Sequence, residues 1–140
     1  MSLFNLFNKE EKESRPAFKV GQEWHYHTRK GEENSTLKIV KIEHNEDEDH
    51  PIIHISVLGI HLVTPQSSKG YVTEMLHLPV EVAAIAGSIT TLKNDRTVLP
   101  DYEFGYVQWK MAYEDNRAGV FNLSVKDIIQ FLETSAQTNK

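Results

Sequence analysis

The sequence predicts an α+β fold, in which a four-stranded antiparallel β-meander is followed by about three α-helices that pack on one face of the sheet. Three observations predict this fold. Residues 18–78 contain runs that alternate apolar and polar side chains, with the period of two typical of strands. The connections between these runs are short and rich in turn residues, which leaves no room for crossover helices. After Pro79 the apolar period becomes that of a helix.

Four runs are predicted to be strands: residues 23–29, 36–43, 52–63 and 71–78. In the first run, Trp24 and Tyr26 are predicted to face the core, and a ligand pocket lined by them is the alternative. In the second run the apolar residues change face between Ile39 and Val40, and in the third they change face next to Gly59. We therefore expect a β-bulge or a kink in each of these two strands.

Three helices are predicted in the second half of the chain. Pro79 suits the start of the first, and helical spacing follows at Val82, Ile85, Ala86 and Ile89. The second helix spans residues 102–115, with Asp101 as its N-cap and Gly119 as its stop signal. In the third, Ser124 and Asp127 form a capping box, and the predicted buried residues are Val125, Ile128, Ile129 and Leu132.

The predicted middle helix carries two apolar stripes. One stripe is aromatic and is sufficient to pack the helix on a sheet: Tyr102, Tyr106, Trp109 and Tyr113. The second stripe must meet either a neighbouring helix or a partner protein, and it contains Phe104, Val107 and Met111. We take Phe104 and Met111 as candidate partner-binding residues, with burial against the other helices as the alternative.

The composition is that of one globular domain. The chain has 140 residues, of which 39% are hydrophobic and 25% are charged. The charged run of residues 9–15 ends at Pro16. We therefore expect a mobile N-terminal leader over residues 1–16, a single domain over residues 17–135 and a disordered tail over residues 136–140.

Several classes of protein are excluded by the same composition. The chain has no cysteine, which excludes disulfides and thiolate chemistry and fits a cytoplasmic location. No apolar run approaches the roughly 20 residues of a membrane-spanning helix, and the N-terminus lacks the features of a secretory signal. The net charge of −5 argues against a nucleic-acid partner and favours a basic protein partner.

Histidines on the predicted strands are candidate metal ligands. His25 and His27 lie two residues apart, so their side chains share one face of a strand, and His54 lies on a later strand. Three imidazoles would suit a divalent transition metal with an open catalytic position. The alternative is that they are ordinary polar residues on a strand face, and on that interpretation no cofactor is expected.

An acidic segment supplies the second set of candidates. Five carboxylates stand close together with no basic residue between them: Glu43, Glu46, Asp47, Glu48 and Asp49. The segment lacks the spaced pattern of an EF-hand calcium loop. A solvated loop is one interpretation, and a contact surface for a basic protein is the other, because clustered acids speed and orient such association.

No motif for nucleophilic catalysis or phosphate binding is present in the sequence. We therefore expect a non-enzymatic, small, acidic, cytoplasmic protein-binding module. Its most concrete form is an inhibitor or immunity protein that neutralises a basic partner, such as a bacterial toxin. The alternative function is a metal-dependent enzyme that uses the histidine cluster, and homodimer formation is left open.

Overall fold

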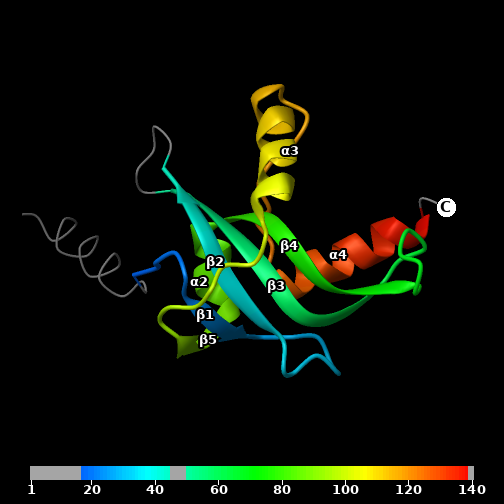
Figure 1. Cartoon of the computed structure of the whole chain (residues 1–140), viewed down its shortest axis with the longest axis horizontal. Coiled ribbons are helices and arrows are strands. Elements are labelled where there is room, and N and C mark those ends of the chain that lie inside the picture. Colours follow the sequence, from blue (N-terminus) through cyan, green and yellow to red (C-terminus); the bar gives the residue numbers. More distant parts are fainter. Residues whose placement is uncertain (1–16, 45–49, 139–140) are drawn as a thin grey trace, which may run out of the picture.

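The computed structural model describes residues 17–44 and 50–138, and these residues form one five-stranded antiparallel sheet and three helices (Figure 1). The strand order is β4-β3-β2-β1-β5. The strands are β1 (Glu23–Tyr26), β2 (Thr36–Glu43), β3 (Ile52–Val63), β4 (Tyr71–Glu81) and β5 (Ile89–Asn94). The helices are α2 (Val82–Ser88), α3 (Glu103–Glu114) and α4 (Val125–Thr138). The predicted α+β class is confirmed, with one strand more than expected.

The two irregularities predicted within strands are present. Ile39 pairs with Ile55, but the next pair is Lys41 with His54, so Val40 is the extra residue of a β-bulge in β2. In β3 the register with β4 shifts between Ile55 and Val57 and again between Leu58 and Leu62. Gly59, within the second interval, has a φ of +78°. Such a backbone conformation strongly favours glycine.

The fifth strand and the course of β4 differ from the prediction. Pro79 lies inside β4, opposite His54, and does not start a helix. Proline is compatible with β4 because this strand is at the edge of the sheet. Ile89 begins β5, which pairs with β1 through Tyr26 and therefore is not helical. The helical spacing that ends at Ile89 predicted a longer helix, but pairing with a distant strand determines the conformation from this residue onward.

The hydrophobic core lies on one face of the sheet, under α2 and α4. It contains the predicted core residues Trp24 and Tyr26 of β1, alternate residues of β2, β3 and β4, Ile85 of α2, and three residues of α4: Val125, Ile128 and Ile129. Figure 1 shows α4 lying along the sheet, where it contacts β3. These α4 residues are the ones that the sequence predicts to be buried, and Leu132 packs against them.

Helix α3 lies on the opposite face of the sheet. Ile53 and Ile55 point into the core, so His54 between them points away from it. The ring of His54 contacts the rings of Tyr106 and Trp109 in α3. The prediction that all helices pack on one face is therefore wrong for α3, because its aromatic stripe covers polar side chains on the other face.

The helix ends are partly as predicted. Ser124 caps α4 through a bond from the backbone N–H of Asp127, which confirms one half of the capping box. Asp101 does not cap α3, whose N-cap is Tyr102 without a side-chain bond. Near the other end of α3, Asn116 adopts a φ of +57°, so the helix stops before Gly119. Helix α4 continues to Thr138, so residues 136–138, which were predicted to belong to a disordered tail, are helical. The predicted leader over residues 1–16 and the last two residues of the chain lie outside the described residues.

Candidate functional site

The candidate site is formed where α3 crosses the polar face of the sheet. Beneath the helix, three side chains from three adjacent strands form a hydrogen-bonded chain: Glu43 in β2, His54 in β3 and His77 in β4. The Nε2 atom of His54 lies 2.9 Å from Oε1 of Glu43, and its Nδ1 atom lies 2.8 Å from Nε2 of His77. We call these three residues the carboxylate–histidine chain.

Helix α3 covers the chain, and one of its side chains bonds each oxygen of the Glu43 carboxylate. The hydroxyl of Tyr106 donates to Oε1 of Glu43 over 3.2 Å, and the ammonium of Lys110 donates to Oε2 over 2.5 Å. The rings of Tyr106 and Trp109 stand edge-on to the ring of His54, each at 5.0 Å between centroids. Under this cover His54 is 0% exposed, and both its ring nitrogens have protein partners.

The number of protons on the two histidines is limited by their hydrogen bond. When both rings are neutral, Nε2–H of His54 donates to Glu43, and its Nδ1 accepts the Nε2–H of His77. One added proton keeps the link, because a single hydrogen still lies between the two rings. A second added proton would place an N–H against an N–H, which breaks the bond. The geometry therefore accommodates one positive charge and opposes two.

The pKa values follow from burial and from neighbouring charges. Burial alone would raise the pKa of Glu43, but hydrogen bonds from Lys110 and His54 outweigh it and lower that pKa below its usual value. Burial lowers the pKa of His54, although Glu43 acts in the opposite direction. Burial, with help from the charge of a protonated His54, lowers the pKa of His77 to about 4. At neutral pH, Glu43 is thus ionised and His77 is neutral.

The outward side of α3 carries the second predicted stripe, and it is exposed. Phe104 is 77% exposed, Val107 is 49% exposed and Met111 is 65% exposed. None of the residues of the helix is buried, and Figure 1 shows the helix rising from the sheet with no other helix beside it. The alternative that this stripe packs against the neighbouring helices does not fit this exposure.

The predicted metal ligands are not brought together. His25 in β1 is opposite Thr36, whereas His54 lies farther across the sheet against Glu43 and His77. His27 is exposed in the segment after β1. Among residues 17–44 and 50–138, no group of three metal-ligating side chains forms a cluster. His25 is therefore a half-buried residue of β1, and His27 is an exposed residue just beyond the end of that strand.

The predicted acidic surface is only partly within the described residues. Glu43 is half-buried beneath α3 and is bonded to His54 of β3 and to Tyr106 and Lys110 of α3. It therefore belongs to the carboxylate–histidine chain. The other four carboxylates, Glu46, Asp47, Glu48 and Asp49, lie outside the described residues.

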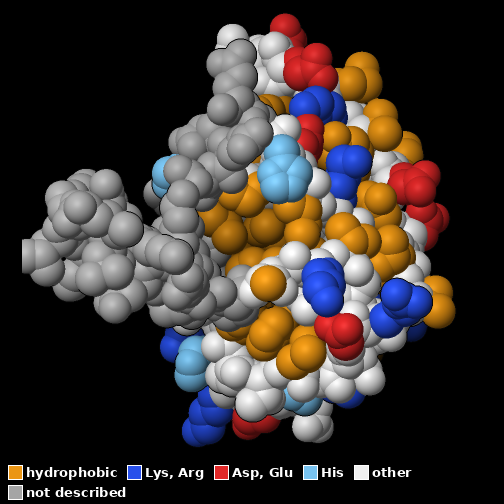
Figure 2. Space-filling view, turned by 90° about the vertical axis from the view of Figure 1, so that its left-hand side faces the viewer, with side chains coloured by type: hydrophobic (Ala, Val, Ile, Leu, Met, Phe, Trp, Pro, Cys, Tyr) orange, Lys and Arg blue, Asp and Glu red, His pale blue; other side chains and the backbone are white. Residues whose placement is uncertain are grey.

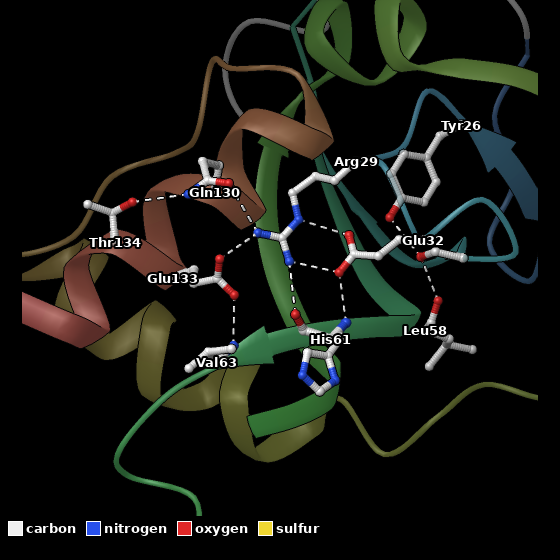
Figure 3. Close-up of polar contacts among 10 residues, drawn as sticks. Tyr26, Arg29, Glu32, Leu58, His61, Val63, Gln130, Glu133 and Thr134 are labelled. Carbon is white, nitrogen blue, oxygen red and sulfur yellow. Dashed lines mark hydrogen bonds and ion pairs between the residues drawn. The ribbon is translucent and has the colours of Figure 1, made fainter. Parts of the chain in front are cut away.

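A second polar cluster, centred on Arg29, joins the turn after β1 to α4 (Figure 3). The guanidinium of Arg29 makes a bidentate contact with Glu32, at 2.9 and 2.7 Å, and also lies 3.0 Å from Glu133. It also donates to the backbone oxygen of His61, and Glu133 accepts the N–H of Val63 in β3. Because every charged group here is engaged by another part of the fold, this cluster holds α4 to the sheet.

Sequence reasoning missed His77, Tyr106 and Lys110 as members of the site. The available signal was Gly105, a glycine inside a predicted helix, which indicates close approach of another group. A Cβ atom at this position would lie 2.9 Å from the Cβ atom of His77. His77 itself was predictable only with the register between β3 and β4, because local sequence does not place it beside His54.

Comparisons of the chain with protein-family models, curated proteins and solved structures found no match. Within the part of the chain that the structure describes, no helix combines the length and apolar character needed to cross a membrane.

Proposed function

We propose that this protein is a small binding module that uses α3 to hold a basic protein partner, in the manner of a cytoplasmic inhibitor or immunity protein that neutralises a bacterial toxin. The observation that carries the proposal is the exposed apolar stripe of Phe104, Val107 and Met111 on a helix that projects from the sheet. Exposed aromatic and methionine side chains of this kind are typical anchors of protein interfaces.

Charge supports a basic partner. The chain has a net charge of −5. Exposed acids flank the apolar stripe at both ends of α3: Asp101, Glu103 and Glu114. Two basic side chains of α3 and the segment after it are paired within the protein, Lys110 with Glu43 and Arg117 with Asp115. An apolar centre with an acidic rim is complementary to a surface that carries an apolar pocket among lysines and arginines.

The apolar stripe on α3 is one of several exposed apolar areas. Figure 2 shows hydrophobic side chains in patches among charged ones on the side of the molecule that faces the viewer. Scattered apolar exposure is normal for a soluble surface. Helix α3 differs because its three side chains recur at helical spacing on an element without any buried residue.

The metal-dependent enzyme has no supporting observation in the described residues. Both ring nitrogens of His54 are used by Glu43 and His77, and His25 lies at a distance across the sheet. Helix α3 also covers His54, the central residue of the carboxylate–histidine chain, which is 0% exposed. We therefore interpret the histidines beneath α3 as part of the support of the binding helix.

The test is capture of a partner from a lysate of the source cells on immobilised protein, followed by reconstitution with the purified partner. The Phe104→Ser/Met111→Ser variant alters the apolar stripe. The Phe131→Ser variant is the matched control, because Phe131 is an exposed aromatic residue on α4. We expect a basic protein that binds the wild type and the control, binds the double variant far more weakly, and is released by about 0.5 M salt.

Three outcomes would contradict the proposal. The double variant could bind the captured protein as well as the wild type does. The captured protein could be acidic, with association that does not respond to salt. Sedimentation could also show that the wild type forms a homodimer that the double variant abolishes, in which case the stripe is covered by a second copy of the chain.

A further inference from the structure

The attachment of α3 to the sheet depends on the carboxylate–histidine chain. The helix has no buried residue and contributes none to the hydrophobic core. Its contacts with the sheet converge on this chain instead. Tyr106 and Lys110 bond Glu43, the rings of Tyr106 and Trp109 rest on His54, and the backbone at Gly105 lies against His77. The helix therefore rests on groups that change charge with pH.

We propose that protonation of His54 and His77 releases α3 from the sheet and thereby makes partner binding sensitive to acid. The consequence for binding rests on the proposed function, whereas the release of α3 is a property of the protein alone. The geometry explains the release, since the bond between Nδ1 of His54 and Nε2 of His77 does not survive a second added proton. The two stacked rings would then be two cations at a centroid distance of 5.0 Å.

The charged groups around the two histidines determine how many protons the pair can bind. The groups that face them are Glu43 and Lys41 from β2 and Tyr106 and Lys110 from α3. The carboxylate of Glu43 favours the first proton on the pair. The ammonium groups of Lys41 and Lys110 oppose any positive charge on His54. Among residues 17–44 and 50–138, Glu43 is the carboxylate that acts on both histidines, and it is already bonded to Lys110, so it offsets a second positive charge on the pair poorly.

The direction of the pH effect follows from linkage. His77 has a pKa of about 4 when α3 covers it, against 6.5 as the ordinary value once it is released into water. Between these values the released state binds more protons than the covered state does. His77 therefore makes its full contribution to the stability of the covered state above about pH 6.5. This contribution decreases as the pH falls toward 4 and does not decrease further below that pH.

The experiment measures amide hydrogen exchange of the free protein at pH 7 and pH 5, corrected for the intrinsic effect of pH. His77→Gln keeps an N–H donor near the position of Nε2 and cannot be protonated. His27→Gln is the matched control, because His27 is exposed and lies outside the site. In the wild type and the control we expect protection of α3 to fall by roughly tenfold at pH 5 while β2 and β3 stay protected. In the His77→Gln variant, α3 should retain its protection.

A second measurement keeps the test valid if the His77→Gln variant fails to fold. In the wild type, nuclear magnetic resonance follows the imidazole signals of His54 and His77 together with the amide signal of Gly105. We expect the Gly105 signal to move with the protonation of the pair.

Three results would overturn the proposal: loss of protection in helix and strands together, equal loss in the His77→Gln variant, or a Gly105 signal that does not follow the imidazoles. These measurements use no partner. Their failure therefore leaves the partner proposal standing. A failed capture experiment removes the consequence for binding and leaves the release of α3 standing.

Discussion

Gly105 and His77 are packed so closely that a Cβ atom at position 105 would lie 2.9 Å from the Cβ atom of His77. Real Cβ atoms do not approach each other at this distance, and the obstacle is the first carbon of the histidine side chain, which cannot move without the strand. The contact sets how near α3 comes to β4. It also explains a glycine in the first turns of a helix, where alanine would otherwise be preferred.

Replacing Gly105 by alanine is expected to loosen α3. The added methyl group must displace the helix from β4, so exchange protection of α3 should fall even though alanine favours helix formation. Gly87→Ala is the matched control, because Gly87 lies in α2 and a Cβ atom there meets nothing within 4 Å. This control should raise the free energy of unfolding by about 0.5–1 kcal/mol. A gain of similar size for Gly105→Ala would contradict the close contact.

Glu43 is expected to stabilise the protein in a pH-dependent manner. Glu43→Gln removes the charge that holds Lys110 and His54, and we expect a loss of about 1–3 kcal/mol in the free energy of unfolding at pH 7. Because the pKa of Glu43 is lowered in the folded state, its contribution is present above the ordinary pKa of 4.5 and is lost as the pH falls through the folded-state value.

Urea unfolding measures this effect at pH 7 and about pH 3, where the wild type and Glu43→Gln should approach each other. Glu103→Gln is the control, since Glu103 is an exposed acid at the start of the same helix. It should behave like the wild type at both values. A constant difference between the wild type and Glu43→Gln across the two values would show that the carboxylate charge is not responsible.

Strand boundaries were predictable where one face of the strand is fixed by the core. β2 and β3 have the predicted bounds, and the change of face at Val40 and the glycine at position 59 mark real irregularities. The reason is physical: with a period of two, each extra residue in a bulge moves all later side chains to the other face, and this leaves a trace in the apolar pattern.

The candidate site was much less predictable, because non-local pairing creates it. Ile89 continues a helical spacing by chance, and only its pairing with Tyr26 in β1 makes it the start of β5. His77 and His54 are 23 residues apart, and their hydrogen bond depends on the irregular register between β3 and β4. The aromatic stripe of α3 did predict a helix with two packing surfaces. It did not reveal that one of them would cover histidines.

Arg29 is expected to be the most sensitive residue of the cluster that holds α4. Arg29→Met leaves Glu32, a nearly buried carboxylate, without its cation, so unfolding should become easier by about 2 kcal/mol or more. Arg117→Met is the matched control, because that guanidinium and its partner Asp115 are each 70% exposed. An exposed pair contributes about 0–1 kcal/mol. Equal effects of the two substitutions in urea unfolding would contradict a structural role for Arg29.

Reversal of the acidic segment is expected to slow partner association. In the quadruple variant, lysine replaces each of Glu46, Asp47, Glu48 and Asp49. The rate constant for association with the captured basic protein should fall by roughly tenfold or more at low salt, and the difference should nearly vanish at high salt. The dissociation rate should change less, because steering acts on the encounter and the apolar stripe of α3 holds the complex.

Surface plasmon resonance at several salt concentrations separates these rates. The control is a triple variant in which lysine replaces exposed acids elsewhere, at Glu33, Glu74 and Asp127. It changes the net charge by a similar amount but not the segment before β3. If both variants slow association equally, only net charge matters and the acidic segment has no special place in recognition. If the quadruple variant associates at the wild-type rate at low salt, the partner does not approach through this segment.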